Sequence, residues 1–226
     1  DVHDAQIRQI TTDDIIPFRE NNIPGILYMA DYDLGKLGEA YNDIDYVNYS
    51  QSTGYFQAWN SGWVYRNDGV DIESNNDPIN SNGFHIGFIA KGEWTKYSVK
   101  VTESGAYSAQ VRVASQETGG KFHLAIDNQD VTETQSVSST GSWTGFSDLT
   151  IDDIVLPEGD HVVTLWFDDN RAFNISSIEF TKTGSVDNLP LVALNGHTGE
   201  NERSIEVTVN QMLLPESISE TPIDFT

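Results

Sequence analysis

The feature that most constrains the fold is a two-residue alternation of apolar and polar side chains in short segments. In the segment 96–101 the apolar positions are Tyr97, Val99 and Val101, and a second such segment spans residues 107–113. A period of two places alternate side chains on opposite faces of a β-strand, so each segment predicts a half-buried strand. No long segment shows the 3.6-residue period of a helix. The chain is therefore predicted to be all-β.

Turn residues separate these strands and set the domain limits. The residues at 103–105 and 157–160 are rich in Gly, Ser and Asp, and the run 161–167 predicts a strand that is buried on both sides. We expect a two-sheet β-sandwich of about eight to ten strands over residues 23–181. Residues 1–22 are predicted to be a linker or the edge of a preceding domain. Residues 182–226 are predicted to be a C-terminal extension or the start of a neighbouring domain, with one strand candidate at 204–209.

The charge of the chain excludes several classes of partner. The net charge is −23, from 35 acidic and 12 basic residues. Phosphate binding needs clustered Lys and Arg, so nucleic acid is excluded, and anionic membranes are disfavoured. No apolar run approaches the roughly 18 residues of a membrane span. The five His are scattered and Cys is absent, which predicts neither zinc nor disulfides. A neutral ligand or a cation fits this composition.

Aromatic and amide side chains recur at turns and strand ends in three short motifs. The motifs span residues 86–97, 139–143 and 173–180. An aromatic face matches the apolar C–H face of a pyranose ring, and an amide matches its hydroxyl rim, so the motifs favour a sugar site. Taken singly, Phe88 is also typical of a core residue, Trp143 of a surface loop, and Asn174 of a turn. The hypothesis therefore depends on the three motifs together.

The ordered set of motifs resembles a family 6 carbohydrate-binding module. The matching segments are residues 38–43, 64–73, 105–107, 111–115 and 156–161, together with the three motifs above. The resemblance implies a β-jelly-roll with a sugar site in the loops at one end of the sandwich; some members also bind sugar on the concave sheet face. It implies a module without catalytic activity, usually attached to a secreted glycoside hydrolase.

The same resemblance assigns roles to individual residues. It implies that Phe88 and Trp143 hold the sugar between two rings and that Asn174 bonds its hydroxyls. Phe88 stands where the family more often has Tyr or Trp, so the stacking face is kept and the polar group is lost. Glu39 lies in a loop that the family uses as a rim of the site. A solvated loop carboxylate remains the alternative for Glu39.

Two further features carry candidate binding residues. Asp71 and Glu73 are two apart in a predicted strand, so they share a face and are candidates for binding hydroxyls or a cation, or for glycoside hydrolysis. A salt bridge to Arg66 is the structural alternative. The segment 46–63 contains six aromatic residues, including Trp63, and departs most from the family spacing. We expect it to shape the sugar site, to pack on a neighbour or to cap one end of the sandwich.

The resemblance also brings a metal question. Most family members hold a structural Ca²⁺ through a Glu-x-Glu on the first strand and an Asp on the last. Here Tyr28 and Ala30 stand at the two Glu positions, and Ser176 stands at the Asp position. Ca²⁺ takes about six to eight oxygen ligands, usually including carboxylates, so the usual calcium site is predicted to be absent. No cofactor is predicted, although calcium binding elsewhere among the acidic residues stays open.

These features lead to one main functional hypothesis and two alternatives. The main hypothesis is an extracellular bacterial module that binds a plant or algal polysaccharide for a covalently linked catalytic domain, with no activity of its own. The first alternative is a small glycoside hydrolase that uses Asp71 and Glu73 or loop carboxylates. The second is a structural or adhesive β-sandwich without sugar binding.

Overall fold

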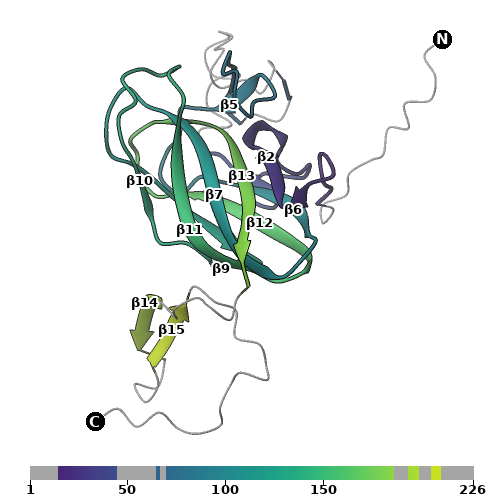
Figure 1. Cartoon of the computed structure of the whole chain (residues 1–226). Helices are drawn as coiled ribbons and strands as arrows, with labels where there is room; N and C mark the ends of the chain where they lie inside the picture. The colour runs from purple at the N-terminus through teal and green to yellow at the C-terminus, as the bar shows by residue number, and fades with distance from the viewer. Residues whose placement is uncertain (1–14, 45–64, 67–69, 186–192, 199–204, 210–226) are drawn as a thin grey trace, which may run out of the picture.

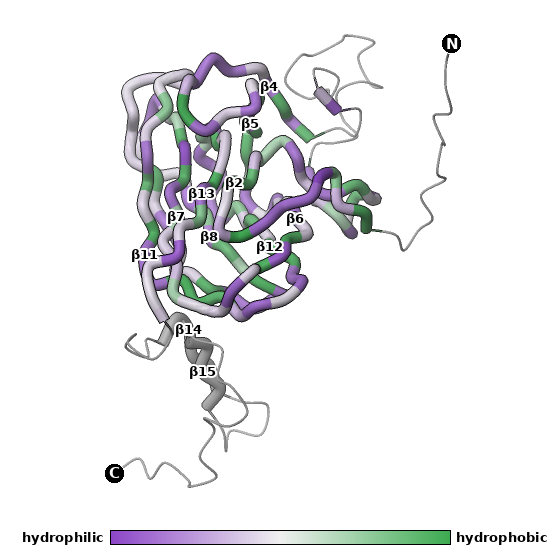
Figure 2. The backbone as a smooth tube through the Cα atoms, turned by 45° about the vertical axis from the view of Figure 1, so that its right-hand side comes forward, coloured by the Kyte–Doolittle hydropathy of each residue, from purple (hydrophilic) through white to green (hydrophobic). Residues whose placement is uncertain are grey.

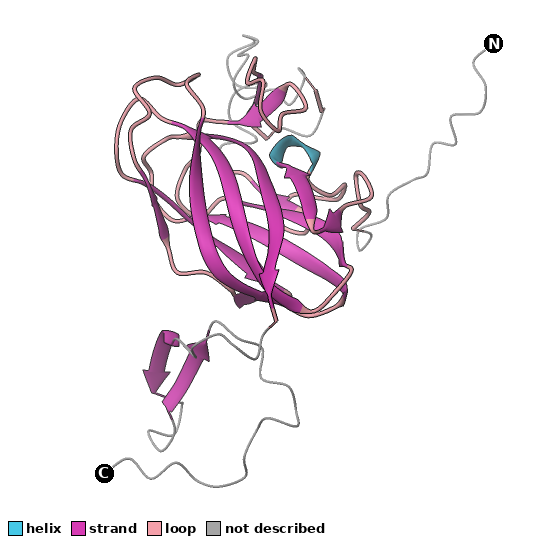
Figure 3. Cartoon of the chain, in the orientation of Figure 1, coloured by secondary structure: helices cyan, strands magenta, loops and turns pink. Residues whose placement is uncertain are grey.

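The computed structural model is a sandwich of two packed β-sheets (Figures 1 and 3). It describes residues 15–44, 65–66, 70–185, 193–198 and 205–209. Within these residues the only helical element is a 3₁₀ turn, η1 (Met29–Asp31). The prediction of an all-β sandwich from the alternating segments is confirmed.

The larger sheet, counted over the described residues, has seven strands in the order β1-β6-β12-β8-β10, with β3 on β6 and β9 on β8. Their bounds are β1 (Asn22–Ile23), β3 (Tyr41–Asn42), β6 (Trp94–Val101), β8 (Gly120–Ile126), β9 (Gln129–Asp130), β10 (Gln135–Val137) and β12 (Gly159–Phe167). Neighbouring strands run antiparallel except for β1, which pairs parallel to β6.

The second sheet has six strands within the same described ranges, in the order β11-β7-β13-β5-β4, with β2 on β13. Their bounds are β2 (Gly25–Tyr28), β4 (Ile72–Ser74), β5 (Phe84–Ile86), β7 (Gly105–Ala114), β11 (Ser147–Leu156) and β13 (Asn174–Gly184). A separate pair is formed by β14 (Ala193–Thr198) and β15 (Ile205–Val209). Strand β15 lies within the predicted strand at 204–209.

The alternating pattern places the core between the sheets. Tyr97, Val99 and Val101 of β6 are buried while Lys100 between them is exposed. Figure 2 shows hydrophobic and hydrophilic residues alternating along the strands. Such apolar burial contributes roughly 25 cal/mol per Å² and gives both sheets one shared core.

The run 161–167 forms most of β12, which lies between β6 and β8. Val163, Leu165 and Phe167 are buried in the core, and Thr164 on the opposite face is buried too. His161 and Trp166 are partly exposed, so the predicted two-sided burial applies to the middle of the strand.

The packed body begins before residue 23. Ile16 pairs with Leu34, and the Asn21 side-chain amide donates to the Ser98 carbonyl at 3.1 Å. The predicted aromatic loop 46–63, including Trp63, lies outside the described residues. No helix in the described part of the chain is long and apolar enough to cross a membrane.

Candidate functional site

A cavity of about 330 Å³ opens at the end of the sandwich that carries β5, uppermost in Figure 1. It is lined by Glu73 and Ser74 of β4, His85 of β5, Phe88, Trp143, Thr144 and Ala172 of the adjoining loops, and Asn174 of β13. The three sequence motifs thus contribute Phe88, Trp143 and Asn174 to one cavity. They are distant in sequence and meet because β5 and β13 are paired neighbours.

Phe88 leaves the core because of its backbone conformation. Its φ of 52° lies in the left-handed region, which bulky residues rarely adopt. Ile86 and Ile89 on either side are buried, whereas Phe88 is 46% exposed. A backbone held in a sparsely populated region is typical of a functional site, since the surrounding structure must maintain it. The strained turn presents an aromatic face at the cavity.

Asn174 approaches the backbone of Gly87 closely. A Cβ at Gly87 would lie 2.7 Å from Asn174 Oδ1 and 3.6 Å from Glu73 Oε2, so only glycine fits without displacing the amide. The Asn174 Nδ2 donates to the Trp143 carbonyl at 2.7 Å. This bond orients the amide so that Oδ1, an acceptor, lies beside Gly87 in a residue that lines the cavity.

Trp143 stands on a turn that is held to the sandwich by hydroxyl groups. Thr140 Oγ1 accepts from the Ser115 amide at 3.0 Å, and Ser139 Oγ donates to the Gln116 carbonyl at 2.8 Å. Gly141 adopts a φ of 88°, which permits the tight reversal. These bonds fix a turn that leaves the Trp143 side chain 41% exposed.

Arg112 of β7 ties two loops of the site together. Its guanidinium bonds both carboxylate oxygens of Asp77, at 2.9 and 2.8 Å, and Asp148 Oδ1 at 2.8 Å. It also donates to the Phe146 carbonyl at 3.1 Å. Asp77 follows β4, which carries Glu73, whereas Phe146 lies just beyond Trp143. Arg112 therefore links the segment that follows β4 to the loop that follows Trp143.

Glu73 and His85 are the titratable residues that line the cavity. They are cross-strand partners in β4 and β5, and Glu73 Oε2 lies 3.5 Å from His85 Nε2. Burial raises the pKa of the Glu73 carboxyl above its ordinary value. Burial lowers the pKa of His85 to about 4, so its ring is neutral at pH 7. The cavity therefore presents the carboxyl group of Glu73 beside an uncharged imidazole.

The other sequence candidates lie elsewhere. Asp71 is 2% exposed just before β4, where its carbonyl accepts the Gly87 amide at 3.0 Å, and it does not line the cavity. Glu39 is exposed in the turn before β3 and is also absent from the lining. Sequence reasoning missed His85 and used Glu73 only as the partner of Asp71. The signal for His85 was its place next to the 86–97 motif.

The three positions of the expected calcium site hold no carboxylates. Ala30 is fully buried, and Tyr28 lies beneath the Arg19 guanidinium, whose Cζ is 5.2 Å from the ring centroid. Ser176 is buried, with its hydroxyl 3.2 Å from Asn75 Nδ2 and 3.4 Å from the Phe84 carbonyl. These residues do not fit Ca²⁺, which favours charged oxygen ligands. Across the described ranges no group of three or more His, Cys, Asp or Glu is placed to hold a metal.

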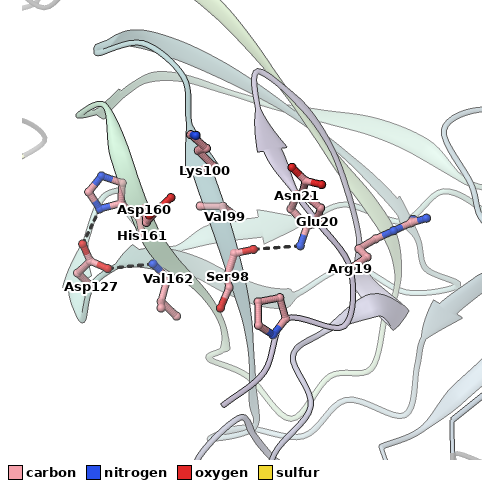
Figure 4. Close-up of a pocket in the computed structure, with 11 residues that line it drawn as sticks. Arg19, Glu20, Asn21, Ser98, Val99, Lys100, Asp127, Asp160, His161 and Val162 are labelled. Atoms are coloured by element: carbon pink, nitrogen blue, oxygen red, sulfur yellow. Dashed lines mark hydrogen bonds and ion pairs between the residues drawn. The ribbon is translucent and has the colours of Figure 1, made fainter. Parts of the chain in front are cut away.

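A second hollow, of about 420 Å³, lies where the segment 17–21 crosses β6 and β12 (Figure 4). Its walls mix charges of both signs, including Arg19, Lys100 and Asp160, and none of its described lining residues is Phe, Tyr or Trp. Figure 4 shows His161 bonded to Asp127, at 2.7 Å, and Asn21 bonded to Ser98.

Comparison with known proteins identifies the family. The sequence model of the family described as carbohydrate binding module (family 6) matches residues 64–182, which is more than half of the chain. This chain belongs to carbohydrate-binding module family 6. The matched range includes β4 to most of β13 and every residue that lines the cavity.

Individual relatives are more distant. A β-agarase of Microbulbifer thermotolerans is 27% identical over 73 residues, which are 32% of this chain and 17% of that enzyme. A β-1,3-glucan-binding module of Bacillus halodurans has 21% identity and a TM-score of 0.50, over 72% of this chain and 98% of that one. A module of Clostridium stercorarium in complex with cellobiose has 18% identity and a TM-score of 0.50, over 73% and 98%. These two structures support the sandwich fold.

Proposed function

We propose that the cavity between Phe88 and Trp143 binds one sugar unit of a neutral plant or algal polysaccharide. The observation that carries the proposal is the pair of aromatic side chains, 46% and 41% exposed, on a cavity whose other groups include the Asn174 amide and the Glu73 carboxylate. Large aromatic residues exposed at a concave surface are typical of ligand sites. The relatives that bind cellobiose and β-1,3-glucan support a saccharide as the ligand.

The chemistry of the walls suits a pyranose ring. Aromatic rings remove the apolar C–H faces of the sugar from water at roughly 25 cal/mol per Å². Asn174 Oδ1 and the Glu73 carboxylate accept bonds from hydroxyl groups. A small interface of this kind predicts dissociation constants from about micromolar to millimolar. Phe88 lacks a hydroxyl, so the polar recognition falls to Asn174 and the groups around it.

The charges favour an uncharged ligand. Among the described residues that line the cavity, Glu73 is acidic and none is Lys or Arg. The chain as a whole has a net charge of −23. Uronate and sulfate groups would therefore meet repulsion without a compensating cation.

The biological setting follows from the family and is part of the proposal. The chain acts outside the bacterial cell as a module joined to a polysaccharide-degrading domain, which it holds near its substrate. The agarase relative, of which the match covers 17%, is consistent with such an arrangement. Hydrolysis by an Asp71–Glu73 pair is disfavoured because only Glu73 lines the cavity.

Affinity gels that contain laminarin, lichenan, xylan or agarose test the proposal. We expect at least one polysaccharide to retard the wild-type chain, and Trp143→Ala to abolish the retardation. Trp94→Ala is the matched control, because Trp94 lies on β6 outside the cavity. Retardation that survives Trp143→Ala but is lost in Trp94→Ala would place binding on the sheet face and contradict the proposal. No retardation by any glycan would favour the structural alternative.

A further inference from the structure

A buried histidine in the cavity has unused hydrogen-bonding capacity. His85 is 2% exposed and lines the cavity. Within the described residues neither of its ring nitrogens has a hydrogen-bond partner. Buried polar groups are nearly always paired, and an unpaired one costs about 1–3 kcal/mol. Because His85 lines the cavity, a polar group bound there can supply the missing partner.

The neighbours of His85 limit what that group is. Glu73 Oε2 lies 3.5 Å from Nε2, which is longer than a normal N–H···O hydrogen bond. The Phe146 ring packs against the imidazole with centroids 5.5 Å apart, in an edge-on arrangement. Since the ring is neutral at pH 7, it has one N–H donor and one acceptor nitrogen. When it is ionised, the Glu73 carboxylate can accept hydrogen bonds but cannot donate one.

We propose that His85 and Glu73 together form hydrogen bonds to one hydroxyl group of the bound sugar. The hydroxyl accepts a hydrogen bond from His85 Nε2–H and donates its own hydrogen to Glu73 Oε2. An oxygen can lie about 2.8 Å from each atom, the usual hydrogen-bond length, if it stands to one side of the line that joins two atoms 3.5 Å apart. The inference rests on the proposed function, because it assigns a role within the same cavity.

This arrangement makes the site selective for a group that is donor and acceptor at once. An ether oxygen can accept from His85 but leaves Glu73 unpaired. A deoxy position leaves both residues unpaired. A carboxylate or sulfate oxygen cannot donate to Glu73 and repels it. Loss of one such buried bond is expected to weaken binding by about tenfold. Asn174 Oδ1 adds a second acceptor, while one N–H of its Nδ2 is bonded to the Trp143 carbonyl.

The test is a double-substitution cycle on the whole chain. Binding of the retained polysaccharide, from the panel of laminarin, lichenan, xylan and agarose, is measured for wild type, His85→Phe, Glu73→Gln and the double variant. Each single change is expected to weaken binding by about tenfold, and the double variant by little more. His161→Phe, which breaks a histidine–carboxylate pair outside the cavity, is expected to bind like the wild type.

A second measurement identifies the hydroxyl. Methyl glycosides of glucose, galactose and xylose, with their monodeoxy derivatives, compete against the same polysaccharide. One deoxy position should lose about tenfold in the wild type and less than about twofold in His85→Phe and Glu73→Gln.

The outcomes separate the two claims. Binding that depends on Trp143 but is unchanged in His85→Phe and Glu73→Gln overturns the inference and leaves the proposed function standing. Fully additive losses in the double variant also overturn it, because the two residues would then bond different groups. Failure of the wild type to bind any of the glycans overturns the proposed function itself.

Discussion

The end cavity and the hollow beneath the segment 17–21 are similar in volume, about 330 and 420 Å³, but opposite in chemistry. The cavity has two exposed aromatic faces and a buried His85 whose ring nitrogens lack partners within the described part of the chain. In the hollow, His161 Nδ1 is bonded to Asp127 and Asn21 is bonded to Ser98, although His161 Nε2 is also buried without a partner among the described residues. Volume therefore does not identify the ligand site. The exposed aromatic faces of Phe88 and Trp143 distinguish the cavity, because they can bury the apolar face of a ligand.

The largest effect is expected from removing the ion pair that frames the cavity. Arg112→Met leaves the carboxylate of Asp77, whose side chain is 2% exposed, without its bidentate partner. We expect the free energy of unfolding to fall by about 3–5 kcal/mol, as for other buried pairs that lose one partner. Urea denaturation followed by circular dichroism measures this change.

The control for Arg112 is an exposed ion pair. Lys182→Met removes a partner of Glu103 at the surface and should leave the unfolding midpoint unchanged. If Arg112→Met were as stable as the wild type, the two loops of the cavity would not depend on this residue.

The next effect concerns pH and the buried histidine of the cavity. Folding lowers the pKa of His85 from 6.5 to about 4. Between these values the unfolded chain binds a proton that the folded chain does not, so the contribution of His85 to stability falls as the pH falls. The difference in unfolding free energy between wild type and His85→Phe should shift by about 3 kcal/mol from pH 7 to pH 4.

Parallel urea titrations at several pH values measure that shift. The expected sign is a loss for the wild type relative to the variant as the pH is lowered. A difference that is constant with pH would mean that His85 titrates normally and is not confined in the cavity wall.

A smaller effect should follow from filling the space at Gly87. In Gly87→Ala the new Cβ would lie 2.7 Å from Asn174 Oδ1, so the amide must move. We expect polysaccharide binding to weaken by about tenfold, because an oriented acceptor is lost, while the fold persists. Affinity electrophoresis measures the loss. Asn21→Ala in the hollow is the counterpart and should bind as the wild type does.

The sequence predicted the sandwich and its strands well because alternation and turn residues are local signals. It predicted poorly which polar residues surround the cavity. Arg112 occupies the outward position of an alternating strand, yet it is buried, since Asp77 and Asp148 reach it from distant segments. Asp71 and Glu73 looked equivalent, but the pairing of β4 with β5 places only Glu73 at the cavity. Such facts depend on tertiary contacts that no local pattern contains.

The most direct test of the account is an NMR titration of the ¹⁵N-labelled chain with an oligosaccharide of the polysaccharide that retards it. The account predicts saturable shifts at the amides of Gly87, Phe88 and Trp143 and at the side-chain amide of Asn174. The amides of Ser98 and His161 in the hollow should stay unchanged. Saturable shifts confined to Ser98 and His161 would contradict the assignment of the sugar to the end cavity.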